Sequence, residues 1–120
     1  MSSSFRDLRV WQQAMDPALG VYAGTAHFPK GEVYGLAQQI RRAAVSVPSN
    51  IAEGKAHNSD KDFRRFLFHA RGSLMELETQ ILLAGKLQYL SEEEASNLQS
   101  SATQVARGLA GLLNALAAAA

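Results

Sequence analysis

The sequence contains no cysteine in its 120 residues. Disulfides, thiolate metal sites and cysteine nucleophiles are therefore excluded. It also lacks an apolar run of the roughly 18 residues that a membrane-spanning helix needs, and its first residues lack the apolar stretch of a signal peptide. From these absences we expect a cytoplasmic protein that has no association with a membrane.

The chain has little net charge, +1 at pH 7 from 12 Lys+Arg and 11 Asp+Glu. Overall charge therefore points to no particular partner. The charges are nevertheless unevenly spread. Residues 1–75 carry 10 basic and 6 acidic side chains, whereas residues 76–120 carry 2 basic and 5 acidic ones. The N-terminal part is thus able to form a basic surface on a nearly neutral protein.

Motifs of catalytic sites are also missing. No Gly-x-Ser-x-Gly or glycine-rich phosphate loop occurs, and the Glu-x-x-His pattern of di-metal bundles is absent. His69 has no histidine or carboxylate four residues away, so a solvated histidine is favoured over a metal ligand. We therefore expect no enzymatic activity, no metal and no cofactor. A hydrolase or metal enzyme remains a third hypothesis, which rests only on the existence of a bundle interior.

Apolar residues recur every three or four positions in four segments, about 5–27, 35–53, 60–87 and 92–116. This period predicts helices, and no useful stretch alternates as a strand would. Short connections then predict an all-α fold, an up-down-up-down four-helix bundle, as a single domain over 1–120. Pro17 and Pro48 predict kinks in the first two helices, or a break of the first into two. A solenoid is the alternative, but no internal repeat is visible.

The same periodicity predicts which faces are buried. In the first helix the predicted buried residues are Leu8, Trp11, Met15, Leu19, Tyr22 and Ala26, and in the second they are Leu36, Ile40, Ala43, Val47 and Ile51. Gly54 is predicted to end the second helix in a left-handed conformation. Ser59 and Ser91 are predicted to cap the third and fourth helices.

The third helix has two apolar stripes. The main stripe consists of Phe63, Leu67, Ala70, Leu74, Leu77, Ile81 and Ala84. The second consists of Phe68, Met75 and Leu82, and on a helical wheel it lies more than roughly 90° from the first. A helix that is apolar on two faces must cover both. We therefore predict that one face packs inside the monomer and that Phe68, Met75 and Leu82 contact another subunit.

Basic side chains concentrate in the middle of the chain. Those that could bind phosphates are Arg41, Arg42, Lys55, Lys61, Arg64, Arg65 and Arg71. The alternative is ordinary ion pairing, for which Arg71–Glu78, Arg64–Asp60 and Arg42–Glu53 are suitable pairs. Aromatic residues for stacking on bases are few here, because Phe63, Phe66 and Phe68 are typical of a core or an interface.

Three stretches together resemble one known family. They are FRDLRVWQQAM at 5–15, YGLAQQIRRAAVSVPSNIAEG at 34–54, and residues 63–79 with the runs ARGS and ELE. The sequence is similar, over about residues 5–90, to the four-helix-bundle proteins named after the 23S rRNA intervening sequence. The run from Arg41-Arg-Ala to Ser-Asn-Ile-Ala-Glu-Gly54 is specific to that family.

The resemblance implies a ring-shaped homopentamer and supplies no catalytic role. A relative that accompanies the reverse transcriptase of diversity-generating retroelements binds nucleic acid and that enzyme. Arg41, Arg42 and Arg71 match family positions, as do Asn50 and Glu53. Two hypotheses follow. The first is an oligomeric bundle that binds RNA, DNA or a nucleic-acid-processing enzyme through arginines. The second is a structural or protein-interaction scaffold with its arginines in ion pairs within and between subunits.

Overall fold

The computed structural model describes residues 4–119 of the chain. Four helices make up most of it, namely α1 (Arg9–Thr25), α2 (Leu36–Ala56), α3 (Asp60–Lys86) and α4 (Glu92–Ala119). A short 3₁₀ helix, η1 (Phe5–Asp7), precedes α1, and a second, η2 (Lys30–Glu32), lies between α1 and α2. Residues 4–119 contain no strand, so the predicted all-α fold is confirmed.

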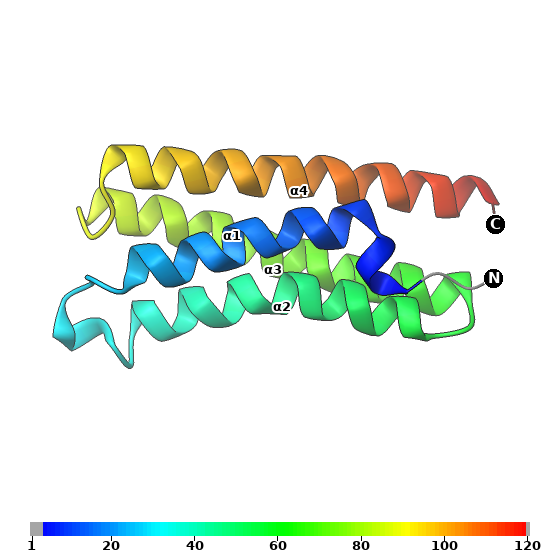
Figure 1. The fold of residues 1–120 in the computed structure, drawn as a ribbon, viewed down its shortest axis with the longest axis horizontal. Coiled ribbons are helices and arrows are strands. Elements are labelled where there is room, and N and C mark those ends of the chain that lie inside the picture. The colour runs from blue at the N-terminus through cyan, green and yellow to red at the C-terminus, as the bar shows by residue number, and fades with distance from the viewer. Residues whose placement is uncertain (1–3, 120) are drawn as a thin grey trace.

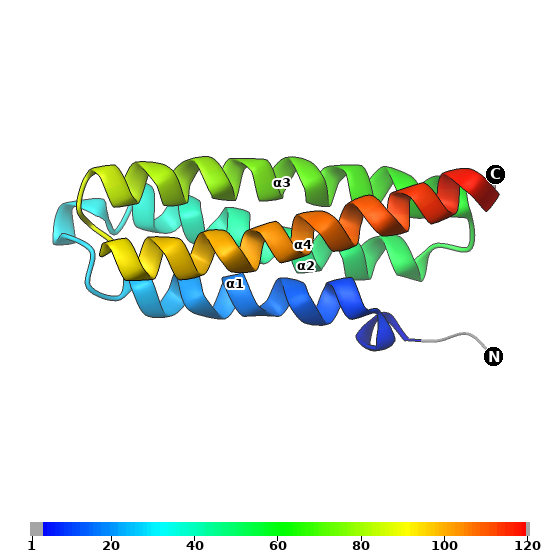
Figure 2. The ribbon, with the colours of Figure 1, turned by 90° about the horizontal axis from the view of Figure 1, so that it is seen from above.

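The helices run antiparallel to their neighbours in the chain and form a rod of 46 × 22 × 20 Å (Figure 1). Each helix packs against two others, so that α1 lies diagonal to α3 and α2 lies diagonal to α4 (Figure 2). The α1–α2 and α3–α4 connections lie at one end of the rod, and the α2–α3 connection lies at the other. This is the up-down-up-down arrangement that the short connections predict.

The core follows the predicted stripes of α2 and α3 closely. All five residues of the α2 stripe and all seven of the main α3 stripe are buried. The interface between these two helices is also the most extensive in the bundle. Burial of the apolar faces of α2 and α3 is thus the part of the fold that periodicity determines most directly. No helix within residues 4–119 is long and apolar enough to cross a membrane.

Gly54 does not end α2, and the prediction of a left-handed cap is wrong. The helix continues to Ala56, and no glycine in the described residues has a positive φ angle. A Cβ atom on Gly54 would lie 2.6 Å from Cβ of Phe66 on α3. Glycine is needed at this position because the two helices approach closely there, and the backbone conformation itself is an ordinary helical one.

The predicted N-caps are confirmed. Ser59 Oγ accepts a hydrogen bond from the backbone N–H of Asp62 at 3.0 Å, and Ser91 Oγ accepts one from that of Glu94 at 3.0 Å. Glu94 also returns the bond, because its Oε1 accepts from the Ser91 N–H at 2.9 Å. These bonds satisfy N–H groups that the first turn of a helix leaves without partners.

The two prolines do not break their helices. Pro17 lies within α1 and Pro48 lies within α2, and both are buried. The predicted division of the first helix into two is therefore wrong. A proline removes one internal hydrogen bond from the helix, but here the packed faces of α1 and α2 hold the helix together. The predicted bend at each proline stays a prediction.

The predicted buried face of the first helix is correct only at its start, where Leu8 and Trp11 are partly buried against the core, and it is wrong further along. Leu19 is 65% exposed and Tyr22 is 50% exposed. The residues that α1 buries are mostly small, namely Val10, Ala14, Pro17, Ala18, Val21, Gly24 and Thr25. A Cβ on Gly24 would lie 3.0 Å from Leu90, and one on Gly20 would lie 2.8 Å from Leu98, so α1 faces its neighbours through small residues. Of the larger side chains of α1, Tyr22 lies beside Arg41 of α2.

Candidate nucleic-acid interface

The seven candidate basic residues do not form a single patch. Ser46 Oγ and Ser73 Oγ lie 2.8 Å apart, which places these residues at the same height on α2 and α3. Because the helices are antiparallel, Arg42 lies toward one end from this height and Arg65 lies toward the other. About 12 residues separate them along the rod, or about 18 Å. Arg41 and Arg42 thus lie near the α1–α2 end, and Lys55, Lys61, Arg64 and Arg65 lie near the opposite end.

Most of these cations have no carboxylate partner among residues 4–119. Among residues 4–119, Arg65 is the one member of the set with an ion pair, to Asp62 at 3.7 Å, and both side chains are about half exposed. The expected pairs Arg71–Glu78, Arg64–Asp60 and Arg42–Glu53 do not form in this part of the chain. The interpretation of these arginines as locked in ion pairs within one subunit is therefore wrong. Helical spacing alone brings charges near each other but does not orient their side chains.

Aromatic rings take the place of carboxylates as neighbours of the cations. Arg41 lies over the ring of Tyr22 at 4.8 Å, Arg65 over that of Phe66 at 4.5 Å, and Arg71 over that of Phe68 at 4.9 Å. Lys55 lies 5.8 Å from the ring of Phe63. A ring attracts a cation without occupying the N–H groups at the edge of a guanidinium. The Nη edges of Arg41 and Arg71 therefore remain free to bind an anion, whereas an Nη of Arg65 lies 3.7 Å from Asp62.

Two of the arginines line a groove on the outer side of α2. The residues around this tyrosine–arginine groove are Tyr22, Val33, Tyr34, Gln38, Arg41, Arg42, Val45 and Ser46. Its volume of about 450 Å³ lies in the range of small-molecule sites. α1 contributes Tyr22, the connection contributes Val33 and Tyr34, and α2 contributes the rest. The groove therefore combines two phenol rings, two guanidinium groups and polar side chains.

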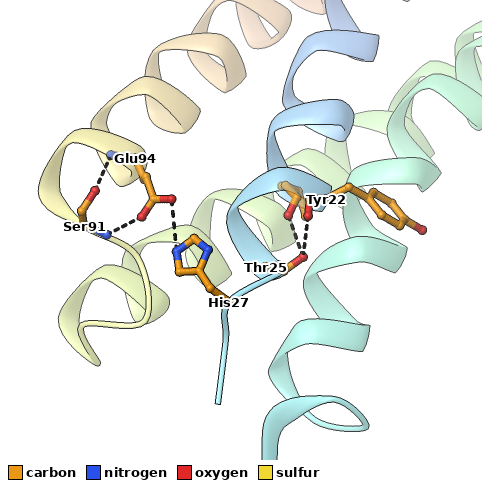
Figure 3. A network of polar contacts seen from close by, with 6 residues as sticks. Tyr22, Thr25, His27, Ser91 and Glu94 are labelled. Carbon is orange, nitrogen blue, oxygen red and sulfur yellow. Dashed lines mark hydrogen bonds and ion pairs between the residues drawn. The ribbon is translucent and has the colours of Figure 1, made fainter. Parts of the chain in front are cut away.

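Arg41 is held in a fixed orientation in this groove. Its Nε donates a hydrogen bond to Thr25 Oγ1 at 2.7 Å, and the buried Thr25 hydroxyl donates to the Val21 carbonyl at 2.7 Å. Figure 3 shows the Thr25 hydroxyl beside the backbone of α1 and the Tyr22 ring directed away from it, toward α2. The Tyr22 ring covers one face of the guanidinium. The Nη edge of Arg41 is thus oriented before any ligand binds.

The segment that carries Tyr34 is also fixed. Glu32 Oε1 accepts from the Leu36 N–H at 3.0 Å, at the start of α2, and Glu32 Oε2 accepts from the Tyr89 hydroxyl at 3.0 Å. This hydrogen bond, with burial and the Glu32 charge adding to it, raises the pKa of Tyr89. The α1–α2 connection is therefore tied to the α3–α4 connection. Tyr34, at 90% exposed, extends from this braced segment into solvent.

The second group of cations lies along the first turns of α3. Lys61, Arg64 and Arg65, with Phe68 and His69, surround a shallow pocket. Nε of Arg64 is buried and has no hydrogen-bond partner within residues 4–119. Arg65 divides its interactions between Asp62 and the Phe66 ring. This group, which we call the α3 basic cluster, comes from one helix and lacks the second wall of the tyrosine–arginine groove.

The second apolar stripe of α3 faces solvent in the monomer. Phe68 is 44% exposed, Met75 is 62% exposed and Leu82 is 56% exposed. We call these three residues the α3 face. Arg71 borders it, since its guanidinium lies over Phe68. Three large apolar side chains in a row along one helix mark a surface suited to protein contact.

The three histidines lie outside the groove, and two of them share one aromatic neighbour. His27 Nε2 contacts Glu94 Oε2 at 3.2 Å and thereby joins the end of α1 to the start of α4 (Figure 3). His57 stacks on Phe66 at 4.9 Å, and His69 is tilted against the same ring at 5.9 Å. Within the part of the chain that the structure describes, His, Asp and Glu side chains do not gather in any group of three that would suit a metal ion.

Two tyrosines of the groove, and the threonine that anchors Arg41, lie outside the predicted site. Periodicity places Tyr22 in the core of the first helix, whereas the structure places its ring at the groove, and the sequence predicts no role for Tyr34 or Thr25. The sequence does contain one signal for Tyr22. Tyr22 lies three positions before Thr25 on a helix with many small residues, and a small-residue face is the one that packs closely.

The fold places this protein in the class of up-down-up-down four-helix bundles. The chain belongs to the 23S rRNA-intervening sequence protein family, which matches residues 6–111. Its fold is similar to that of a protein of unknown function from the S23 ribosomal protein family of Bacteroides thetaiotaomicron, with a TM-score of 0.78. The two sequences are 20% identical, and the similarity covers 87% of this chain and 97% of the other. No curated protein matches this sequence significantly. Neither the family nor the solved structure indicates an enzyme.

Proposed function

We propose that this protein is a non-enzymatic, nucleic-acid-binding bundle that acts as a homo-oligomer. The observation that supports this most strongly is the state of its arginines. Arg41, Arg42, Arg64 and Arg71 have no carboxylate partner among residues 4–119, and Arg41 is oriented by Thr25 and Tyr22. An arginine in this state is suited to bidentate contact with a phosphate.

One property of nucleic acids and one property of this chain fit the proposal. Phosphates recur along a strand, so separate cationic sites on one rod can contact the same molecule. The charges also lie on a chain of net charge +1, which means that binding would be local and not the result of a generally basic surface. RNA, DNA and a nucleic-acid-processing enzyme are the partners we propose, and the cytoplasm is the compartment.

The direct test is the binding of fluorescent single-stranded RNA at low ionic strength, measured by anisotropy. The double variant Arg41→Ala/Arg42→Ala should bind at least about tenfold more weakly than the wild type, because two charge-assisted contacts are lost. Arg9→Ala/Arg107→Ala is the matched control. It removes the same charge from exposed positions outside the groove and should retain affinity within about threefold. If neither RNA nor DNA binds the wild type at low salt, the proposed function is wrong.

Self-association is proposed for a separate reason, the exposure of the α3 face. The occupant that we propose is a second copy of the chain. Burying Phe68, Met75 and Leu82 removes apolar surface from water, at about 25 cal/mol per Å². The count of five copies comes from the resemblance to the family, since an exposed face does not determine a number. A scaffold held by ion pairs between subunits stays the alternative, in which the arginines meet carboxylates of a neighbouring copy.

A further inference from the structure

The tyrosine–arginine groove differs from the α3 basic cluster in what it offers a ligand. The cluster presents cations from one helix. The groove adds two rings, Tyr22 and Tyr34, from two further segments. The ring of Tyr22 already has Arg41 on one face, at 4.8 Å. The ring of Tyr34 is 90% exposed. One ring therefore positions a cation and the other is available to a ligand.

Tyr34 is exposed on a rigid support. Glu32 binds the N–H of Leu36 through one carboxylate oxygen and the hydroxyl of Tyr89 through the other, both at 3.0 Å. The Gly35 N–H donates to the Glu32 carbonyl, also at 3.0 Å, which closes the turn around Tyr34. A ring on a braced turn loses little backbone freedom when a ligand stacks on it. This is the property of a stacking platform.

We propose that the groove holds one nucleotide of a single strand, with its phosphate on the guanidinium groups of Arg41 and Arg42 and its base on the ring of Tyr34. This inference rests on the proposed function and adds a preference for single-stranded over double-stranded nucleic acid. Bases in a duplex are already stacked and paired, so an exposed ring gains contact only with an unstacked base. The phosphate contact is available to either form.

An anionic occupant fits the groove better than an apolar one. An apolar helix of another protein would cover Tyr22, Val33 and Val45 but would bury Arg41 and Arg42 without partners. Burial of an unpaired charge is costly. A phosphate instead pairs with both guanidinium groups. A second copy of this chain in the groove is the competing outcome, and the experiment is designed to detect it.

The experiment compares oligothymidylate of about 20 nucleotides with a duplex of the same length, both by anisotropy. Tyr34→Ala should weaken binding of the single strand about tenfold, the size of one lost base–aromatic stack, and leave the duplex within about twofold. Tyr34→Phe keeps the ring and should restore binding of the single strand. Tyr34 lies outside the core, so its replacement leaves the fold in place. Arg42→Ala should weaken both forms.

Each result has one meaning. Equal loss of single strand and duplex in Tyr34→Ala, or no loss in either, overturns the groove assignment and leaves nucleic-acid binding in place. Failure of the wild type to bind any strand at low ionic strength overturns the proposed function and this inference together. Sedimentation of the free protein identifies the competing occupant. If Tyr34→Ala changes the oligomeric state, then a second copy fills the groove and the inference is wrong.

Discussion

The orientation of Arg41 depends on one buried hydroxyl group. Thr25 Oγ1 accepts from Arg41 Nε and donates to the Val21 carbonyl, so the side chain is linked to the backbone of α1 through two bonds of 2.7 Å. A free arginine side chain loses the freedom of several rotatable bonds when it binds a ligand. Arg41 is already held by Thr25, so it loses less conformational entropy. The contribution of Thr25 to binding is therefore indirect and measurable.

Thr25→Val retains the shape of the side chain and removes the acceptor. We expect the affinity for single-stranded RNA to fall about fivefold, the value of one hydrogen bond, and less than in Arg41→Ala. Thr79→Val is the matched control, since Thr79 also donates to a carbonyl four residues earlier but lies exposed on α3. Anisotropy measures both. Equal affinity of Thr25→Val and the wild type would show that Arg41 needs no anchor.

Two glycines of the α2–α3 pair provide a stability test at the same scale. Gly54→Ala should destabilise the fold by about 1–3 kcal/mol, because its new methyl group would lie 2.6 Å from Cβ of Phe66 and the helices would have to separate. Gly72→Ala meets no atom within 4 Å and should stabilise α3 by about 0.5–1 kcal/mol. Urea denaturation measures both. A neutral Gly54→Ala would mean that the close approach is not needed.

At the scale of elements, the capping residues at the start of α4 make the stability of the fold depend on pH. The backbone hydrogen bond to Ser91 holds the pKa of Glu94 below its usual 4.5, and the Ser91 hydroxyl and the charge of His27 act in the same direction. A carboxyl group with a lowered pKa stabilises the folded state at pH above its unfolded value and loses that contribution as the pH falls. The capping box, and with it the His27 contact, therefore weakens in acid.

Glu94→Gln should remove this dependence. We expect the wild type to exceed the variant in free energy of unfolding above pH 4.5, and the difference to shrink progressively below it. Glu93→Gln is the control, because Glu93 lies in the same first turn but is exposed. It should show a smaller difference. Urea denaturation at several pH values decides, and a difference that persists unchanged in acid would contradict the role of Glu94.

Periodicity predicted the main buried faces of α2 and α3. On the predicted stripe of α2 and the main stripe of α3 the apolar residues are all buried, so hydrophobicity and burial agree there. In α1 they disagree. Ala14, Ala18 and Gly24 are buried, while Leu19 and Tyr22 are exposed. A sequence pattern ranks side chains by hydrophobicity, whereas close helix packing selects small ones, and only the packed structure shows which requirement prevails.

For the whole molecule, the arrangement of the site was the least predictable part. Arg41 lies near the start of α2 and Arg64 lies near the start of α3. The starts of these two antiparallel helices lie at opposite ends of the rod (Figure 1). The same topology brings Thr25 and Tyr22 of α1 to Arg41. The groove is therefore a product of tertiary packing, and residue types in one segment predict only its charge.

The proposed self-association involves a different surface, the α3 face. Met75→Glu places a charge at the centre of the α3 face and should convert an oligomer into monomers, which analytical ultracentrifugation measures. Ala23→Glu adds the same charge at an exposed position on α1 and should leave the oligomer intact. A closed ring of more than two copies would need a second, different surface on each copy. Met75→Glu that sediments like the wild type would exclude the α3 face as an interface.

The salt dependence of single-stranded RNA binding tests most directly whether Arg41 and Arg42 contact phosphates. Each phosphate contact adds about 0.7 to the slope of log affinity against log salt for a single strand. Arg41→Ala/Arg42→Ala should therefore flatten the slope by about 1.4, whereas Arg9→Ala/Arg107→Ala should leave it unchanged. If the groove variant has the slope and affinity of the wild type, the account of these arginines is wrong.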